Sequence, residues 1–427
     1  MKISILNGRL LDPASRIDRD SDLHIADGLI AAVGEVPAAF RADRTLDARG
    51  HLVCPGLVDL CARMREPGAE HKATIASETR AAAASGITSL CCPPDTRPVI
   101  DTPAVAQLVA QTAERAGWAR VFPAGALTKG LEGEQISEMA ALKHAGCTVM
   151  SHADRPITNT QVLRRAMEYA ATFGLTVFLR PEDRYLRDQG CVHEGAVSTR
   201  LGLPGIPEAA ETVALARDLA LAEQTGARVH FRGLSCGRAA TMLAEARSRG
   251  VRASADVSAH QLFLTEEAVD GFDARCHLLP PLRTGEDLAA LRAAVARGEI
   301  AAVCSDHQPH EEDAKLAPFP ATEPGLSGLE TLLPLLLRLV ADGVLDLPTA
   351  VARLTLGPAK ILGLPLGRLD VGRAADVCVF DPEARWLLTP STLVSQGHNT
   401  PFLGWELKGR VSWTLLAGRI VYERDRP

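Results

Sequence analysis

The sequence has no run of about 18 uncharged apolar residues, and it has no block of charge of one sign. A membrane-spanning helix needs about 20 predominantly apolar residues, so the sequence predicts none. The formal net charge is −6, with acidic and basic residues interspersed along the chain. This pattern gives no reason to expect nucleic acid or an anionic membrane as a partner, and it favours a small metabolite or another protein.

Targeting and disulfide signals are also missing. The opening residues "MKISILNGRLLDP" lack a basic segment, a long apolar segment and a small-residue cleavage site, so we expect a cytoplasmic protein. The chain has ten cysteines, but most lie inside apolar runs and none forms a C-x-x-C pair. We therefore expect reduced, buried thiols.

Between residues 53 and 364 the chain alternates short apolar runs with longer helical patterns rich in Ala, Leu and Glu. The runs are "GLVDLCA", "GITSLCC", "ARVFPAG", "CTVMSHA", "LTVFLRP", "ARVHFRG", "VRASADV" and "IAAVCSD". Eight runs separated by helical segments predict a closed (β/α)8 TIM-type barrel, because parallel strands buried on both faces are nearly continuously apolar.

The two ends of the chain follow a different pattern. Residues 1–52 and 365–427 carry short alternating strands with turn signals, and neither end has enough residues for a stable sheet of its own. We expect the ends to pair into one small β-sandwich beside the barrel. The irregular segment 311–328, "EEDAKLAPFPATEPGLSG", follows the eighth strand, where active-site loops often lie.

Several stretches match one family in order along nearly the whole chain. They include "PGLVDLCARMREPGAEHKATI", "CCPPDTRPVIDTPAV", "PPLRTGEDLAALR", "SDHQPH", "GLSGLETLLPLLL" and "NTPFLGWELKGRV". On these motifs the chain resembles dihydroorotase-like members of the amidohydrolase superfamily. The resemblance implies a barrel with a sandwich built from both termini. In active relatives, one or two Zn²⁺ ions generate a hydroxide that attacks a cyclic amide.

Most metal-ligand positions implied by the resemblance carry other residues. The first-strand pattern H-x-H and the ligand positions of the fourth, fifth and sixth strands now read, in chain order, Cys61, Arg63, His152, Ala153, Arg180 and Gly233. Only Asp306, in "SDHQPH" after the eighth strand, remains of the set. We therefore expect no catalytic residues and no metal, with Asp306 as a vestige of the site.

The positions that the resemblance assigns to substrate binding are partly kept. Arg65 is retained, and His310 stands where the family has a histidine near the substrate. Asp95 replaces an asparagine, and Leu279 replaces the asparagine that usually precedes "PPLR". A pocket that has lost amide donors and gained a carboxylate would discriminate poorly for dihydroorotate.

A rebuilt zinc site is the main alternative for these positions. Cys61, His152 and Asp306 could offer sulfur, nitrogen and oxygen to one Zn²⁺. Against this, Arg63 and Arg180 would point into the same space, and at 4 Å each would oppose a divalent ion by roughly 8 kcal/mol at an effective dielectric constant near 20. The same arginines could instead neutralise the buried Asp306 carboxylate, so we expect at least one of them within ion-pair distance of it.

The remaining polar residues have two interpretations each. Arg65 is either a rim arginine paired with a carboxylate such as Glu66 or a retained anion grip. His307 and His310 are expected to be hydrogen-bonded structural histidines and not metal ligands.

The pattern of losses is most similar to that of non-catalytic dihydroorotase-like chains that accompany aspartate carbamoyltransferase in some bacteria. The resemblance implies a structural or activating subunit in pyrimidine biosynthesis, bound to the carbamoyltransferase catalytic chain and forming a homodimer within a hetero-oligomer, without a cofactor. Two alternatives stay open. The chain could be an active dihydroorotase or other cyclic amidohydrolase with an atypical zinc site, or a sensor whose arginine-lined cavity binds a carboxylate or phosphate.

Overall fold

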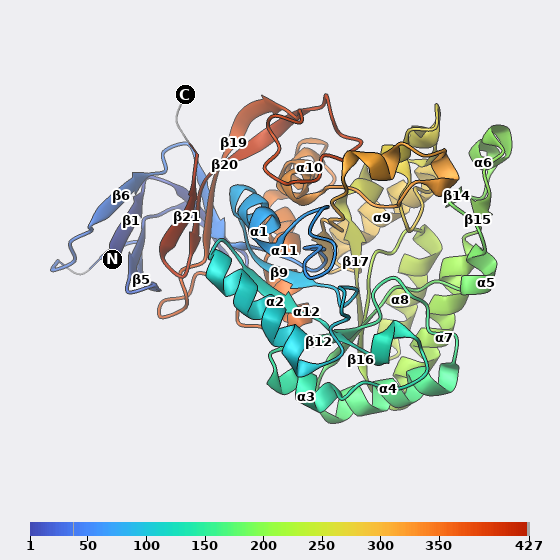
Figure 1. Cartoon of the computed structure of the whole chain (residues 1–427). Coiled ribbons are helices and arrows are strands. Elements are labelled where there is room, and N and C mark those ends of the chain that lie inside the picture. Colours follow the sequence, from blue (N-terminus) through green and yellow to red (C-terminus); the bar gives the residue numbers. More distant parts are fainter. Residues whose placement is uncertain (37, 425–427) are drawn as a thin grey trace.

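The computed structural model describes residues 1–36 and 38–424. It has a larger part, in which parallel strands alternate with helices, and a smaller part made of antiparallel and mixed sheets near the two chain ends (Figure 1). Among the described residues, no helix is both long and apolar enough to cross a bilayer.

Apart from the short pair β14-β15, the described residues of the larger part form nine parallel strands in two sheets. One sheet has the order β10-β9-β8 and the other the order β11-β12-β13-β16-β17-β18. Seven of the eight apolar runs each coincide with one of these strands. The third run, "ARVFPAG", contains β10 and the first residue of β11. The bounds are β8 (Leu57–Asp59), β9 (Ile87–Cys92), β10 (Arg120–Pro123), β11 (Gly125–Ala126), β12 (Val149–Ser151), β13 (Thr176–Leu179), β16 (Arg228–Phe231), β17 (Ala253–Ser258) and β18 (Ala302–Cys304).

The two parallel sheets are connected on both sides. On one side β10 and β11 follow each other along the chain, with Ala124 between them. Beyond β8 and β18, Ala62 and His307 form a parallel bridge. The N–H of Arg63 donates to the carbonyl of His307 at 2.9 Å, and that of His307 donates to the carbonyl of Cys61 at 3.1 Å. Residues 61–63 and 305–307 are therefore neighbours.

The helices begin and end at residues typical of helix termini. Thr74 and Thr284 cap helices through their side chains, and Pro103 opens a helix that ends before Gly117 in a left-handed conformation. The helices of this part are α1 (Ile75–Ala84), α2 (Pro103–Ala116), α3 (Met139–His144), α4 (Thr160–Thr172), α7 (Ala209–Thr225), α8 (Gly237–Ser248), α9 (Gly285–Arg297), α10 (Leu329–Ala341), α11 (Leu347–Leu354) and α12 (Leu356–Leu362).

Both chain ends build the smaller part, as the sequence predicts. A four-stranded sheet has the order β5-β4-β1-β6, and a six-stranded sheet has the order β21-β20-β19-β7-β2-β3. The bounds are β1 (Lys2–Leu6), β2 (Arg9–Asp12), β3 (Ile17–Asp20), β4 (Leu23–Ala26), β5 (Leu29–Val33), β6 (Arg44–Asp47), β7 (Leu52–Pro55), β19 (Val377–Leu387), β20 (Glu406–Leu416) and β21 (Arg419–Glu423).

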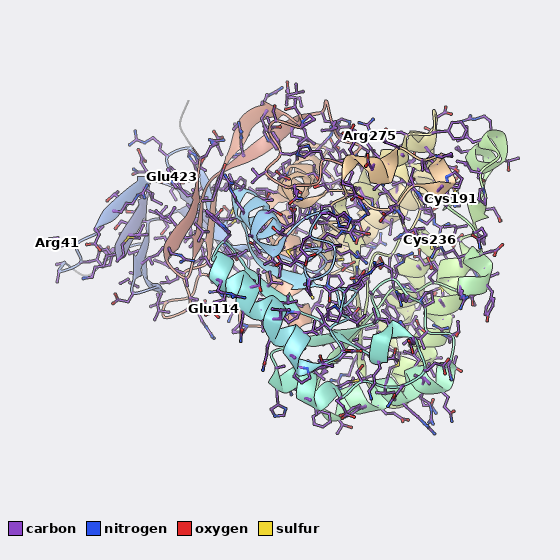
Figure 2. All side chains as sticks on the ribbon, in the orientation of Figure 1. Arg41, Glu114, Cys191, Cys236, Arg275 and Glu423 are labelled. Carbon is purple, nitrogen blue, oxygen red and sulfur yellow. The ribbon has the colours of Figure 1, made fainter. Side chains whose placement is uncertain are left out.

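The two sheets of the smaller part share one buried core. Apolar side chains from both sheets, among them Ile3, Ile25, Val379 and Leu415, form a single hydrophobic cluster. Arg44 on β6 also donates to Glu423 on β21 at 2.6 Å, and Glu423 is labelled in Figure 2. This arrangement is a β-sandwich. Strand β7 runs to Pro55, three residues past the predicted limit of the N-terminal half.

Short elements follow the carboxyl ends of several parallel strands in the chain. They are α5 (Arg184–Arg187), β14 (Val192–His193), α6 (Ala196–Leu201), β15 (Gly205–Ile206), η1 (Lys129–Leu131), η2 (Ala259–Leu262), η3 (Glu266–Val269), η4 (Ala274–Cys276), η5 (Glu312–Lys315) and η6 (Phe319–Ala321). A separate apolar cluster joins the segments that follow β13, β17 and β18. Its members include Cys191, Val269, Phe319 and Leu326. All ten cysteines of the chain are free and buried, as expected.

Candidate functional site

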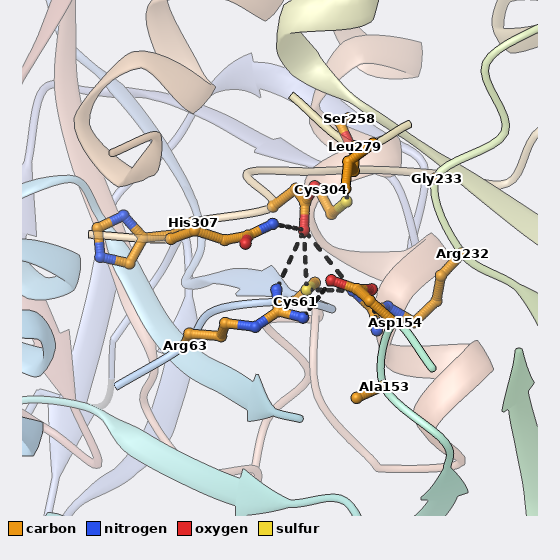
Figure 3. Close-up of polar contacts among 12 residues, drawn as sticks. Cys61, Arg63, Ala153, Asp154, Arg232, Gly233, Ser258, Leu279, Cys304 and His307 are labelled. Carbon is orange, nitrogen blue, oxygen red and sulfur yellow. Dashed lines mark hydrogen bonds and ion pairs between the residues drawn. The ribbon is translucent and has the colours of Figure 1, made fainter. Parts of the chain in front are cut away.

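Charged side chains converge where the parallel strands end (Figure 3). They follow five different strands, with Cys61 and Arg63 both after β8, and they meet because the carboxyl ends of neighbouring parallel strands lie at one edge. We call this group the strand-end cluster, and its members are Cys61, Arg63, Asp154, Arg180, Arg232 and Asp306.

Asp306 is a central acceptor of the cluster. Nη1 of Arg63 lies 3.7 Å and Nη2 of Arg232 lies 3.6 Å from its Oδ1 atom. The thiol of Cys61 donates to the same oxygen at 3.2 Å, and the side-chain amide of Gln308 donates to it at 3.3 Å. The expectation that an arginine at a former ligand position would pair with Asp306 is confirmed for Arg63.

Asp154 is the second acceptor. Arg63 donates to its carboxylate through Nη2, and Nη1 of Arg180 and Nη1 of Arg232 lie 3.4 Å and 3.9 Å from Oδ1. Burial by itself raises the pKa of Asp154, but the guanidinium groups of Arg63, Arg180 and Arg232 hold that pKa well below its usual range. Asp154 is therefore a carboxylate at neutral pH.

The arginines of the cluster stay charged. Burial alone would lower the pKa of Arg63 and of Arg232, but neighbouring acidic groups raise both values well above the usual one. Arg63 also donates from Nε to Asp95 at 2.8 Å. Arg180 binds Glu182 at 2.5 Å, and its Nη1 donates to the carbonyl of Leu279 at 3.3 Å.

Cys61 is a neutral thiol in this environment. Burial raises the pKa of Cys61 well above its usual value, an effect that Arg232 only partly offsets. The sulfur accepts from Nη2 of Arg232 at 2.5 Å while its proton points at Asp306. A thiol held in this state is a poor nucleophile and a poor metal ligand, since both roles need the thiolate.

Three of the candidate residues from the sequence lie outside the cluster. His152 turns away, with Nε2 2.8 Å from the hydroxyl of Thr128, and Ala153 packs in a small apolar cluster. Gly233 contributes only its N–H, which donates to Asp256 at 2.6 Å. The neighbours Asp154 and Arg232 enter the cluster instead, and the sequence analysis named neither of them.

Arg65 and His310 lie beside the cluster and contact each other. Nε of Arg65 donates to the carbonyl of Pro309 at 2.9 Å, and its Nη2 lies 3.0 Å from Nε2 of His310. Burial, together with the nearby Arg65 and Lys72 cations, lowers the pKa of His310 to about 2. His310 is therefore neutral at pH 7 and is a hydrogen-bonding residue in this position.

His307 is a structural histidine. Its Nε2 lies 2.8 Å from Glu78, and its Nδ1 accepts from the N–H of Gly328 at 3.1 Å. Glu78 in turn accepts from the hydroxyl of Ser395 at 2.6 Å. This fully buried network ties α1 to the segment after the eighth strand and to the C-terminal part of the chain.

The residues of the cluster do not fit a zinc ion. Within residues 1–36 and 38–424, no group of three or more His, Cys, Asp or Glu side chains is arranged to hold a metal. Nη1 of Arg63 and Nη1 of Arg232 are buried without a hydrogen-bond partner in this described part of the chain. Such unmet N–H donors call for an acceptor, whereas each guanidinium would oppose a divalent cation at 4 Å by roughly 8 kcal/mol.

A cavity of about 300 Å³ opens beside the cluster. Cationic side chains contribute much of its wall, and Glu323, in the segment after the eighth strand, also lines it. The charged residues that line it are Arg63, Arg65, Lys72, Asp95, Arg97 and Glu323. The retained arginine and the substituted asparagine position therefore face the same cavity.

Known proteins match the chain over nearly its full length. A dihydro-orotase-like family model matches residues 50–236, and an amidohydrolase family model matches residues 335–422. A "Dihydroorotase-like protein" of Pseudomonas aeruginosa is 53% identical over 99% of this chain and 100% of its own length. A "Dihydroorotase" of Syntrophotalea carbinolica is 46% identical, with 99% of each chain covered.

Solved structures show the same fold. An L-hydantoinase (dihydropyrimidinase) from Arthrobacter aurescens superposes with a TM-score of 0.89 at 23% identity, covering 99% of this chain and 96% of its own. A D-hydantoinase superposes with a TM-score of 0.84 at 26% identity, covering 99% and 95%. Because the Pseudomonas and Syntrophotalea relatives are 53% and 46% identical over 99% of this chain, the chain belongs to the dihydroorotase-like family of the amidohydrolase superfamily.

Proposed function

We propose that this chain is a dihydroorotase-like protein without hydrolase activity that acts in the cytoplasm as a structural subunit of an aspartate carbamoyltransferase complex. The observation that carries the first half is the strand-end cluster, in which Arg63, Arg180 and Arg232 fill the space that the family resemblance assigns to metal ligands. The partner in the second half rests on the family resemblance.

The chemistry of the cluster supports a non-catalytic role. Hydrolysis of a cyclic amide needs an activated water and a group that shuttles the proton. Asp306 would be the proton carrier by resemblance, but its carboxylate is held between Arg63, Arg232 and the Cys61 thiol. The active-hydrolase alternative would need these cations to leave, and this packing opposes that.

The retained scaffold supports an assembly role. We take the two parallel sheets as one closed (β/α)8 barrel, an interpretation that the backbone contacts between residues 61–63 and 305–307 support. If the whole fold is kept while the site at the strand ends is neutralised, the remaining use of the fold is to present a shape and a surface to a partner. A homodimer within a hetero-oligomer would bury roughly 2,000 Å² or more at each obligate interface.

Co-expression with the aspartate carbamoyltransferase of the same organism tests the proposal. We expect the two chains to elute together in size-exclusion chromatography with light scattering, and the carbamoyltransferase to be smaller or less active when alone. Asp306→Asn, which keeps the shape of the side chain, should leave co-elution unchanged. Separate elution at micromolar concentration, with carbamoyltransferase activity unaffected by mixing, would refute the subunit role.

A further inference from the structure

A second cavity, of about 420 Å³, lies between η4, the segment that begins with η5, and the loop that joins β19 to β20. It shares no lining residue with the cavity beside the strand-end cluster. Leu316, Pro390 and Leu403 contribute apolar surface to its wall, and Arg275 and Lys315 bring basic side chains to it. Arg275 is labelled in Figure 2. A cavity of this size can hold a small molecule.

Lys315 differs from Arg275 in how its charge is compensated. The Arg275 guanidinium is bound by the carboxylate of Asp273 at 2.7 Å. Among residues 1–36 and 38–424, no carboxylate forms an ion pair with Lys315, and its Nζ donates instead to the backbone carbonyl of Glu323 at 2.5 Å. Lys315 is therefore a half-buried amine at the wall of a cavity without a carboxylate partner.

The backbone keeps Lys315 in this position. The N–H of Glu323 donates to the carbonyl of Ala314 at 3.0 Å, next to the bond between Lys315 and Glu323, so the two ends of the segment are tied together. A neutral amine can keep its bond to the Glu323 carbonyl, because it still has N–H donors. Its lone pair is then available to a molecule in the cavity.

The surroundings of Lys315 favour this neutral form. Burial lowers the pKa of Lys315 to about 8, and the Arg65 cation acts in the same direction, whereas Cys276, Glu323 and Asp273 oppose it. At pH 7.5 about a quarter of such amines are neutral, compared with about 0.1% for a lysine whose pKa is near 10.4. A lysine that is desolvated near another cation is an activated nucleophile. The titratable and charged groups on and around this segment are Arg65, Asp273, Arg275, Cys276, His277, His310, Glu311, Glu312, Asp313, Glu323 and His398.

The lining of the cavity limits the kind of molecule that can reach the amine. Glu311 and Glu312 are part of the wall, so an anionic compound would meet like charge. The apolar surface of Leu316, Pro390 and Leu403 would instead pack against an uncharged organic group. A neutral compound with an electrophilic carbon fits both the wall and the nucleophile.

We propose that Lys315 is a covalent attachment site for small neutral aldehydes, which it binds as imines in this cavity. The amine lone pair forms a bond to the carbonyl carbon, and the carbonyl oxygen takes up a proton to give a carbinolamine. The hydroxyl group then leaves with a proton from nitrogen as water, and a C=N bond remains. The reaction needs no oxidant or reductant, and hydrolysis reverses it. This site goes beyond the proposed subunit role and does not depend on it.

Reductive trapping on the full chain tests the site. The protein is incubated at pH 7.5 with benzaldehyde and sodium cyanoborohydride, and peptide mass spectrometry measures the rate of labelling at every lysine. Lys143 is the internal reference, because its Nζ also donates to a backbone carbonyl, that of Phe173 at 2.8 Å, but its side chain is exposed. We expect Lys315 to be labelled about tenfold faster, since a larger neutral fraction outweighs the lower nucleophilicity of a weaker base.

Variants and conditions separate the site from general lysine reactivity. Lys315→Arg should remove the fast label, and Lys143→Arg should leave it unchanged. Asp273→Asn should speed labelling of Lys315, because the Asp273 carboxylate raises the pKa of that amine. The rate at Lys315 should rise with pH up to about pH 8 and level off above it, as the amine becomes fully neutral. With 4-formylbenzoate, an anionic aldehyde, the ratio of Lys315 to Lys143 labelling should fall.

Two outcomes overturn the proposal, and both are measured on the unmodified chain, so a variant that fails to fold does not obscure them. One is equal labelling of Lys315 and Lys143 by benzaldehyde, which would show that the amine is not activated. The other is a higher ratio of Lys315 to Lys143 labelling with 4-formylbenzoate than with benzaldehyde, which would show that the cavity does not select neutral compounds. Neither outcome affects the subunit role, which co-elution decides.

Discussion

Arg63 and Asp306 face each other across the strand ends, with Nη1 of the arginine 3.7 Å from Oδ1 of the aspartate. By the family resemblance, one position is a metal-ligand histidine and the other an aspartate of the same site. In this chain the positive charge opposite Asp306 is part of the polypeptide. A chelator cannot remove such a charge, and no metal has to be acquired for the site to be neutral.

The first prediction concerns metal content and turnover. Purified protein should contain far less than one zinc per chain and should not hydrolyse dihydroorotate, because three guanidinium groups occupy the place of a cation. Elemental analysis and a hydrolysis assay, each with and without chelator, measure this. Restoring histidine by Cys61→His and Arg63→His should not create activity, since Arg180 and Arg232 remain. Turnover in the unmodified protein that Asp306→Ala abolishes would contradict the prediction.

The second prediction concerns Arg232. Arg232→Met keeps much of the side-chain volume but leaves Asp154 and Asp306 with fewer cations in a buried site, so it should lower the free energy of unfolding by about 3–5 kcal/mol. Urea denaturation measures the change. Arg249→Met removes an exposed partner of Glu223 and should cost less than about 1 kcal/mol. Equal effects of the two variants would show that the Arg232 pairs are not stabilising.

Sequence reasoning located the cluster but misassigned some of its members, and the physical reasons differ. Arg232 lies one residue beyond the end of β16 and two residues after His230, so the two-residue spacing of a strand could have identified Arg232 in place of Gly233. Alternation fails for Asp154. The chain leaves β12 at Ser151 and Ala153 adopts φ +51°, which reverses the direction of the next side chain. No sequence pattern predicts that this alanine adopts the left-handed backbone conformation.

The fold itself was more predictable than the site. Apolar runs bounded by helical patterns are strong local signals, and all eight contain parallel strands. Pairing of the two chain ends was predicted because each end is short, and the six-stranded sheet that contains β2, β3, β19, β20 and β21 confirms it. Ion-pair partners such as Arg180 with Asp154 depend on side-chain directions at strand ends, which sequence spacing alone does not determine.

The third prediction concerns pH. The pKa of Asp154 in the folded chain is well below its ordinary value near 4, so its ionisation contributes stability that is complete above about pH 4–5 and is lost as the pH falls toward the folded pKa. The difference in unfolding free energy between the wild type and Asp154→Asn should therefore be constant from pH 7 to 5 and shrink toward pH 3. Urea titrations at several pH values measure it. A difference that grows on acidification would contradict the assignment.

The fourth prediction concerns Gly68 at the cavity wall. A Cβ atom there would lie 2.4 Å from both Cβ and the backbone oxygen of Arg97, and the backbone has φ +104°. Gly68→Ala should therefore destabilise the chain by about 1–3 kcal/mol, through strain plus overlap. Gly146→Ala is the control, because Gly146 has φ +103° and no atom within 4 Å of the added Cβ. Thermal unfolding measures the destabilisation of both variants, and the difference between them is the cost of the overlap with Arg97. Equal destabilisation of the two variants would show that the overlap has no cost.

The pairing of β7 with β19 sets the order in which the chain can fold during synthesis. Cys54 lies opposite Cys378, so the six-stranded sheet joins residues about 320 positions apart. At about 5–20 residues per second, β7 leaves the ribosome roughly 15–65 s before its partner. The parallel strands and helices can fold within that interval. The first strands of the chain, in contrast, must wait with apolar faces uncovered until β19 and β20, which supply the other half of their core, have been synthesised.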